Sequence, residues 1–163
     1  MGSGSESSSS KTLPAPDEVL NTFGFEIEEL SPKRVRGHLK VSDDCCQSWK
    51  MLHGGVVAVI AESLASLGAH MSSGFRRIAG IQLSINHFAA AHLGDVVMAD
   101  ATPITLDQTI QVWMVQFWKI NPSTHESTKA LISTSNVTII SNLPIAEKLR
   151  KAAAVPLTKY AKL

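Results

Sequence analysis

Glu62 is the one charged residue between His53 and Arg76. This stretch opens on two glycines, Gly54 and Gly55, and continues without proline through residues rich in Ala, Leu and Val. The pattern predicts one helix of about five turns. A carboxylate can act as a nucleophile or a general base, and unpaired N–H groups at a helix N-terminus can hold an anionic oxygen. Together these residue types favour chemistry at an acyl carbonyl.

Ser66 lies four residues after Glu62 and therefore on the same face of the predicted helix. The helix is apolar on nearly all sides, so we expect it to be buried on most of them. A lone carboxylate in such a helix is either used by the protein or turned to its one hydrated side. The residues alone leave both interpretations open.

The segments around this helix predict a sheet that positions it. Two alternating segments precede the helix and four follow it, which predicts an α+β fold with a curved antiparallel sheet wrapped around one central helix. The exposed edges of such a sheet could be covered by a second copy of the chain. The expected strands are 23–30, 33–41, 78–88, 96–104 (ending near Pro103), 109–119 and 128–140, with shorter helices opening at Asp17 and covering 144–154.

Length and composition exclude several classes of protein. The chain has 163 residues, 44% of them hydrophobic, and a formal net charge of +1, which suits one domain with a real core. Nothing in this charge balance calls for a nucleic acid or a membrane as partner, and no stretch is expected to span a membrane. Adjacent Cys45 and Cys46 are expected to be free thiols, and no metal-ligand spacing or cofactor motif is present.

The two ends differ from the predicted domain at 13–155. Residues 1–12 contain six serines and are expected to be disordered. The tail at 156–163 ends in Ala161, Lys162 and Leu163, which resembles the peroxisomal targeting tripeptide Ser-Lys-Leu. It predicts a peroxisomal location and an import receptor as a partner.

The spacing of four polar residues resembles the active-site pattern of hotdog-fold acyl-CoA thioesterases, in the branch of the Arthrobacter-type 4-hydroxybenzoyl-CoA thioesterase. In that branch a Gln lies six residues before the His of an HGG motif, a Glu nine after it, and a Thr or Ser four after the Glu. Gln47, His53, Glu62 and Ser66 reproduce these spacings. A second block, Asn86-His87 after a strand led by Gly, also matches. The resemblance covers about residues 20 to 142.

Within this family the chain is particularly similar to the plant peroxisomal 1,4-dihydroxy-2-naphthoyl-CoA thioesterases of phylloquinone biosynthesis, through the segments HGGV, AESLAS, GAHM, GIQLSINH, NLPI and AKL. This resemblance implies hydrolysis of an aromatic acyl-CoA to 1,4-dihydroxy-2-naphthoate and CoA. A peroxisomal fatty acyl-CoA thioesterase and a non-catalytic acyl-CoA binding module are the alternatives. A dehydratase is less favoured, because its usual Asp/His pair is not evident.

The resemblance also implies a role for each site residue. The Gly54 N–H would bind the thioester oxygen, Glu62 would act as nucleophile or general base, and Gln47 would polarise the thioester. His53 would hold the loop and the Gly54 amide, while Ser66 would come from a partner subunit. We therefore expect a homo-oligomer, a dimer of dimers, with active sites between subunits.

Two further segments would bind the CoA part of the substrate. Related bacterial proteins often carry arginines where this chain has Ala89, Ala90 and Asn136. Arg76, Arg77 or a lysine of a partner chain would then have to contact the CoA phosphates instead. The predicted substrate-binding and CoA-binding residues are Gly55, His87, Phe88, Ala89, Ala90, Thr105, Leu106, Asp107, Gln108 and Thr109.

Overall fold

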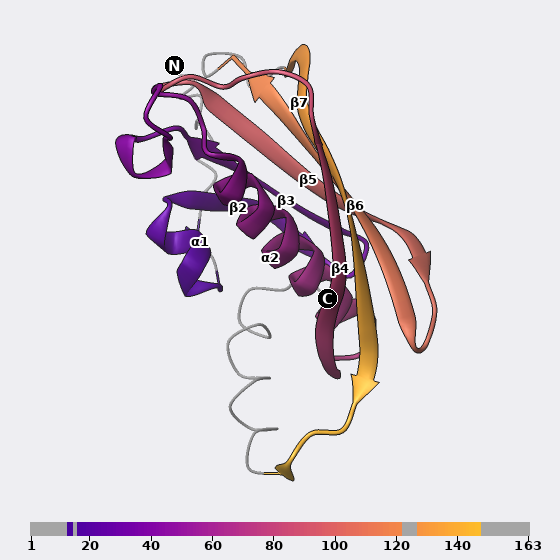
Figure 1. Cartoon of the computed structure of the whole chain (residues 1–163). Helices are drawn as coiled ribbons and strands as arrows, with labels where there is room; N and C mark the ends of the chain where they lie inside the picture. Colours follow the sequence, from indigo (N-terminus) through magenta and orange to yellow (C-terminus); the bar gives the residue numbers. More distant parts are fainter. Residues whose placement is uncertain (1–12, 15, 122–126, 148–163) are drawn as a thin grey trace, which may run out of the picture.

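The computed structural model describes residues 13–14, 16–121 and 127–147 of the chain (Figure 1). Its strands form one antiparallel sheet in the order β1-β2-β3-β5-β6-β7-β4. The elements are β1 (Leu13–Pro14), α1 (Glu18–Thr22), β2 (Phe25–Ser31), β3 (Arg34–Lys40), η1 (Asp43–Cys45), α2 (Gly54–Ser72), β4 (Arg77–His87), β5 (Val96–Leu106), β6 (Ile110–Ile120) and β7 (Ser127–Leu143).

The central helix α2 lies across one face of the sheet, which curves behind it (Figure 1). In β3, Val35, Gly37 and Leu39 are buried while the residues between them are only partly covered, as the alternation predicted. The inward-facing side chains of the strands meet the buried side of α2 in one core. This confirms the α+β fold with a sheet wrapped around one helix.

The structure corrects three details of the predicted elements. β5 continues beyond Pro103 to Leu106: Pro103 still pairs with Trp113 of β6, and a register shift directly after it, between Pro103 and Thr105, accommodates the proline within the strand. The short β1 and η1 were not predicted. Residues 144–146 are not helical, and the rest of the predicted helix at 144–154 lies mostly outside the described residues, as do the head at 1–12 and the tail at 156–163.

α2 is less enclosed than its composition predicted. About half of it is buried, and Glu62 is on the exposed side of the single chain. By its length and apolar composition alone, α2 could also cross a membrane. The expectation that no segment is long and apolar enough to do so is therefore wrong. A helix packed into the concave face of a sheet passes the same test, and α2 is packed in this way.

Strand β4 forms one edge of the sheet and pairs only with β7 among the described strands. Most of its residues are exposed, including Ile81, whose exposed fraction is 57%. Leu83 and Ile85 are only partly covered by the core. An unpaired edge of this length with apolar side chains is a surface that proteins normally protect.

Candidate active site

The N-terminus of α2 is capped in a way that leaves one backbone donor free. His53 is the N-cap residue, and its Nδ1 accepts a hydrogen bond of 2.8 Å from the Gly55 N–H. A Cβ atom on Gly55 would lie 2.9 Å from that Nδ1, so glycine is needed for this cap. The Gly54 N–H has no acceptor among the described residues. The His53 ring therefore holds the amide of Gly55, where the Gly54 amide was expected. The Gly54 N–H remains available for an oxygen.

Gln47 lies in the loop that precedes this helix end. Its Oε1 accepts a hydrogen bond from the Trp49 N–H, so the donating NH₂ end of the amide is the one left for a ligand. The loop is tied to the helix by a 2.8 Å bond from the His53 N–H to the Cys45 carbonyl. Gln47 thus keeps a free donor, which the predicted role of polarising a thioester requires.

The cysteines beside Gln47 are free, as predicted. Burial raises the pKa of the Cys46 thiol, and the nearby Asp43 carboxylate raises it further. Cys45 is buried in the core, where its Sγ lies 3.6 Å from the Phe23 carbonyl oxygen. The raised pKa means that Cys46 is not activated as a thiolate nucleophile.

His87, the last residue of β4, packs against the start of α2. Its Nε2 lies 3.2 Å from the point that a Cβ of Gly54 would occupy. Its Nδ1 is 2.9 Å from the Oγ of Ser133 on β7. The following residues Phe88, Ala89 and Ala90 are exposed. The structure therefore brings His87 next to Gly54 and leaves the three residues after it exposed.

Glu62 points away from the core and lies over β4. Its Oε1 lies 2.7 Å from the point that a Cβ of Gly80 would occupy. Within the part of the chain that the structure describes, the carboxylate has no hydrogen bond or ion pair. It is thus a free anionic oxygen at the surface of α2, as a nucleophile or a general base requires.

One chain does not bring Glu62 to Gly54. Glu62 lies eight positions after Gly54 in α2, which is about 12 Å along the helix axis. A group that attacks a carbonyl must approach to about 3 Å while the carbonyl oxygen is held. Ser66 is one turn further along the helix and is half-buried. The predicted catalytic residues therefore fall into two groups, one at the start of α2 and one in its middle.

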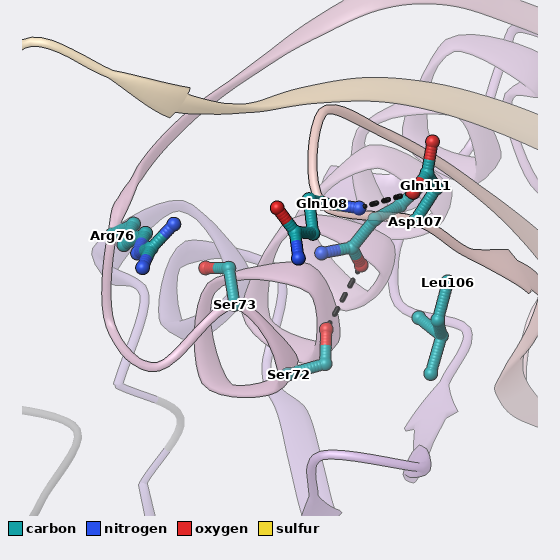
Figure 2. Close-up of a pocket in the computed structure, with 7 residues that line it drawn as sticks. All are labelled: Ser72, Ser73, Arg76, Leu106, Asp107, Gln108 and Gln111. Atoms are coloured by element: carbon teal, nitrogen blue, oxygen red, sulfur yellow. Dashed lines mark hydrogen bonds between the residues drawn. The ribbon is translucent and has the colours of Figure 1, made fainter.

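The segment 105–109 lies at the other end of α2. Three of its residues line a cavity of about 310 Å³ together with the end of the helix (Figure 2). Gln111 forms part of its wall, and its Oε1 accepts a 2.9 Å hydrogen bond from Ser72. In Figure 2, Arg76 lies at one side of this cavity and Leu106 at the other. The residues that line it are Ser72, Ser73, Arg76, Leu106, Asp107, Gln108 and Gln111.

The two arginines considered for CoA phosphates take different partners. Arg76 donates to the Asn142 Oδ1 at 3.2 Å and also lines the cavity at the end of α2. Arg77 donates to the Pro144 carbonyl at 3.0 Å. Of the two, Arg76 is placed to meet a ligand in this cavity. The described residues contain no cluster of three His, Cys, Asp or Glu side chains that could hold a metal ion.

Comparisons with known proteins place this geometry in a family. A family model described as "Thioesterase superfamily" matches residues 50–124. The chain is also 48% identical over 136 residues to 1,4-dihydroxy-2-naphthoyl-CoA thioesterase 2 of Arabidopsis thaliana, covering 83% of this chain and 87% of that protein. The chain belongs to the thioesterase superfamily. It is an enzyme of the thioester hydrolase type, as the Gln47, His53, Glu62 and Ser66 spacing predicted.

Two further matches agree with this membership of the thioesterase superfamily. The chain is 32% identical to the 1,4-dihydroxy-2-naphthoyl-CoA hydrolase of Listeria monocytogenes, covering 74% of this chain and 93% of that protein. Its structure is similar to the crystal structure of S. sahachiroi AziG, with a TM-score of 0.68 and 26% identity, covering 78% of this chain and 98% of the other. These matches confirm the predicted family and the hotdog fold.

Two buried polar residues that support the site, Ser133 and Gln111, were not predicted from the sequence. Ser133 is fully buried and contacts His87. Gln111 is also buried, accepts from the Trp113 Nε1–H at 2.9 Å and donates to the Ala69 carbonyl at 3.3 Å. The inward position of Gln111 in an alternating strand was a signal of this role, because a buried amide needs partners. Ser133 lies in a strand rich in Ser and Thr and had no such signal.

Proposed function

We propose that this thioesterase hydrolyses an aromatic acyl-CoA, 1,4-dihydroxy-2-naphthoyl-CoA, to 1,4-dihydroxy-2-naphthoate and CoA. The observation that carries the proposal is the free Glu62 carboxylate on the same helix as the free Gly54 N–H. The substrate is supported by two relatives whose names specify this thioester, one of them 48% identical.

The chemistry follows from these two groups. The Gly54 N–H and the Gln47 NH₂ donate to the carbonyl oxygen, which makes the carbonyl carbon more electrophilic. Glu62 then either attacks this carbon, forming a mixed anhydride that water hydrolyses, or takes a proton from the water that attacks. In both routes the C–S bond breaks, CoA leaves as a thiolate that takes up a proton, and the carboxylate of Glu62 is regenerated.

We further propose that the working site is shared by two copies of the chain. The 12 Å estimated above between Gly54 and Glu62 is too long for one copy to use both. Pairing of two β4 edges about a twofold axis would reverse the direction of the second α2. Its middle would then lie beside the first Gly54, bringing Glu62 and Ser66 to it, and the cavity near Arg76 would lie further along the second helix.

This arrangement also accounts for the position of the segment 105–109. The cavity at the C-terminal end of the partner's helix would take the nucleotide part of CoA, with Arg76 as its cationic group. The association of two such dimers into a tetramer rests on the family resemblance. Light scattering tests it: a tetramer is expected, and a monomer would contradict the shared site.

The substrate is tested by measuring release of free thiol from a panel of CoA esters. We expect 1,4-dihydroxy-2-naphthoyl-CoA to be hydrolysed with a higher kcat/KM than benzoyl-CoA or straight-chain fatty acyl-CoA. A preference for straight chains would replace the proposed substrate with a fatty acyl-CoA. Binding of all esters without thiol release would point to a binding module.

The role of Glu62 is tested by Glu62→Gln, which keeps the shape of the side chain and removes its charge. We expect kcat to fall by at least about 10²-fold, because the amide is neither a nucleophile nor a base. Glu147→Gln, at another exposed glutamate, is the matched control and should leave kcat unchanged. If Glu62→Gln unfolds at the normal temperature and turns over substrate at a near-normal rate, Glu62 is not the nucleophile or general base.

We also propose a peroxisomal location, supported by the tripeptide Ala161-Lys162-Leu163, which lies outside the described residues. A fluorescent protein fused in front of the chain should collect in peroxisomes. Deletion of these three residues should leave it in the cytosol, and an unchanged distribution would contradict the proposal.

A further inference from the structure

Ser133 is a buried hydroxyl directly beside the candidate active site. It lies on β7 opposite His87 of β4, and its side chain is fully buried. Its Oγ is 2.9 Å from the His87 Nδ1. The proposed mechanism gives no role to Ser133. Its only side-chain partner among the described residues is a histidine that packs against Gly54, so it can control how that ring is presented.

The direction of this hydrogen bond follows from the chemistry of the two groups. A serine hydroxyl has one hydrogen, and a neutral imidazole has one N–H. If the His87 Nδ1 carried the hydrogen and donated it, the buried Ser133 hydroxyl hydrogen would be left without an acceptor in the described residues, which is unfavourable. The Ser133 O–H therefore donates to Nδ1, and the hydrogen of the neutral ring is on Nε2.

A neighbouring serine shows the alternative arrangement. Ser135, two residues along β7, is buried as well, but its hydroxyl donates to the Val115 carbonyl at 3.3 Å. No such backbone acceptor is recorded for the Ser133 hydroxyl in the described chain. The two serines thus differ in one respect that matters here, which is whether their hydroxyl hydrogen goes to the backbone or to His87.

The Nε2 atom faces the helix end where the thioester oxygen would lie. It is the ring atom nearest to Gly54, 3.2 Å from the point that a Cβ would occupy, with Cε1 at 3.5 Å and Cδ2 at 4.0 Å. Because Gly54 has no side chain, no Cβ stands between this ring edge and the helix end that carries the free Gly54 N–H. A hydrogen on Nε2 would add a third donor to the Gly54 N–H and the Gln47 NH₂ that the proposed mechanism directs at this oxygen.

We propose that Ser133 is a positioning residue that holds His87 as the Nε2–H tautomer, so that Nε2–H and the Gly54 N–H both donate to the thioester oxygen. The inference rests on the proposed function, because it uses the same reacting carbonyl. It makes His87 a donor to the oxyanion, and the neutral ring in this tautomer has no free lone pair on Nε2 with which to act as a base.

The tautomer can be measured without any substrate. Nitrogen-15 NMR of labelled histidine side chains, with the His87 signals assigned by their loss in His87→Gln, distinguishes Nδ1–H from Nε2–H. We expect Nε2–H in the wild type and in Ser135→Ala, and a mixture of both tautomers in Ser133→Ala. An Nδ1–H tautomer in the wild-type protein would overturn the proposal, whether or not any variant folds.

Kinetics separate positioning from a general structural effect. Ser133→Ala should lower kcat by about tenfold with little change in KM, because the affected bond to the oxygen strengthens in the transition state. Ser133→Thr, which restores a hydroxyl, should recover part of the loss, and Ser135→Ala should stay within about twofold of wild type. Equal losses of kcat in the two alanine variants would overturn the proposal. If the wild type releases no thiol from any ester, the proposed function fails, while the NMR result still decides the tautomer.

Discussion

Glu62 and Gly80 illustrate how one missing side chain positions a carboxylate. The Glu62 Oε1 lies 2.7 Å from where a Cβ on Gly80 would be, so glycine leaves the space that the carboxylate uses. The clash that Gly80→Ala creates is with the far end of a flexible side chain, which can rotate away at little cost. We expect this variant to lower kcat by about tenfold or more through displacement of Glu62, and to change thermal unfolding little.

A double variant shows whether this loss acts through Glu62. In the Glu62→Gln variant the reacting carboxylate oxygen is already absent. Displacing the side chain at position 62 then has no further effect on turnover. Gly80→Ala should therefore have no additional effect on kcat in the Glu62→Gln background, since residues that act as one unit are not additive. Independent losses in the double variant would show that Gly80 affects turnover in another way.

At the scale of elements, the packing of α2 on β6 depends on another glycine. A Cβ on Gly68 would lie 2.4 Å from the Trp113 ring, and Trp113 is fully buried and held through its Nε1–H by Gln111. Gly68→Ala should therefore lower the free energy of unfolding by about 1–3 kcal/mol, despite the better helix propensity of alanine. Denaturant unfolding measures this change.

The control for this contact shortens the aromatic side chain. Trp113→Phe removes the part of the indole that a Cβ on Gly68 would meet, at the cost of the Nε1 hydrogen bond. Combined with Trp113→Phe, Gly68→Ala should cost less than it does alone. Additive losses of stability would contradict the steric explanation.

The turn before β5 carries a pH-dependent contribution to stability. Burial alone would raise the pKa of the Asp95 carboxyl, but hydrogen bonds from the Lys119 ammonium and the His92 N–H, both 2.8 Å long, outweigh it and lower the pKa below its ordinary 3.8. A lowered pKa in the folded state stabilises the fold above the ordinary pKa. This stabilisation is lost as the pH falls below about 4 through the folded value.

Asp95→Asn should therefore destabilise the protein by about 1 kcal/mol at pH 7 and by clearly less at pH 3. Thermal unfolding of wild type and variant at both pH values measures the difference. Asp44→Asn, at an exposed aspartate in the neighbouring loop, is the control and should change little. A loss of stability in Asp95→Asn that is the same at both pH values would contradict the lowered pKa of Asp95.

Most elements were predictable because their patterns are local. The alternation in β3 and the proline-free apolar run of α2 each determine an element within one segment. Pro103 misled the prediction of β5, because a register shift with β6 depends on a partner strand. The exposed position of Glu62 was likewise undetermined by composition, since it depends on which side of α2 the sheet covers.

The candidate site was predictable as a set of residues but not as an arrangement. The spacing of Gln47, His53 and Glu62 gave their types and their order along the chain. It did not reveal that His53 caps Gly55 and leaves Gly54 free, or that Ser133 meets His87. Contacts between distant segments depend on strand register, which a sequence without its partners does not determine.

At the scale of the whole molecule, two features of the single chain support the proposed shared site. Its edge strand β4 is open and carries exposed Ile81, and the backbone of Glu62 beside it is about 12 Å along α2 from that of Gly54. A second copy paired through β4 would cover this edge and bring a reacting carboxylate to each oxygen-binding end. Pairing through β4 would thus explain both the open edge strand and the separation of Glu62 from Gly54. Complementation between two inactive variants tests it.

Glu62→Gln and Gln47→Ala each inactivate a different half of the shared site. In a mixed dimer of the two variants, one site receives both changes and the other receives neither. Unfolding and refolding an equal mixture of the two inactive variants should therefore restore about one quarter of wild-type turnover, because half of the dimers are mixed and half of their sites are intact. A single-chain site would give no recovery, since every chain carries a defect. The double variant Glu62→Gln/Gln47→Ala, refolded with Glu62→Gln, is the control and should stay inactive, because every site then lacks the Glu62 carboxylate.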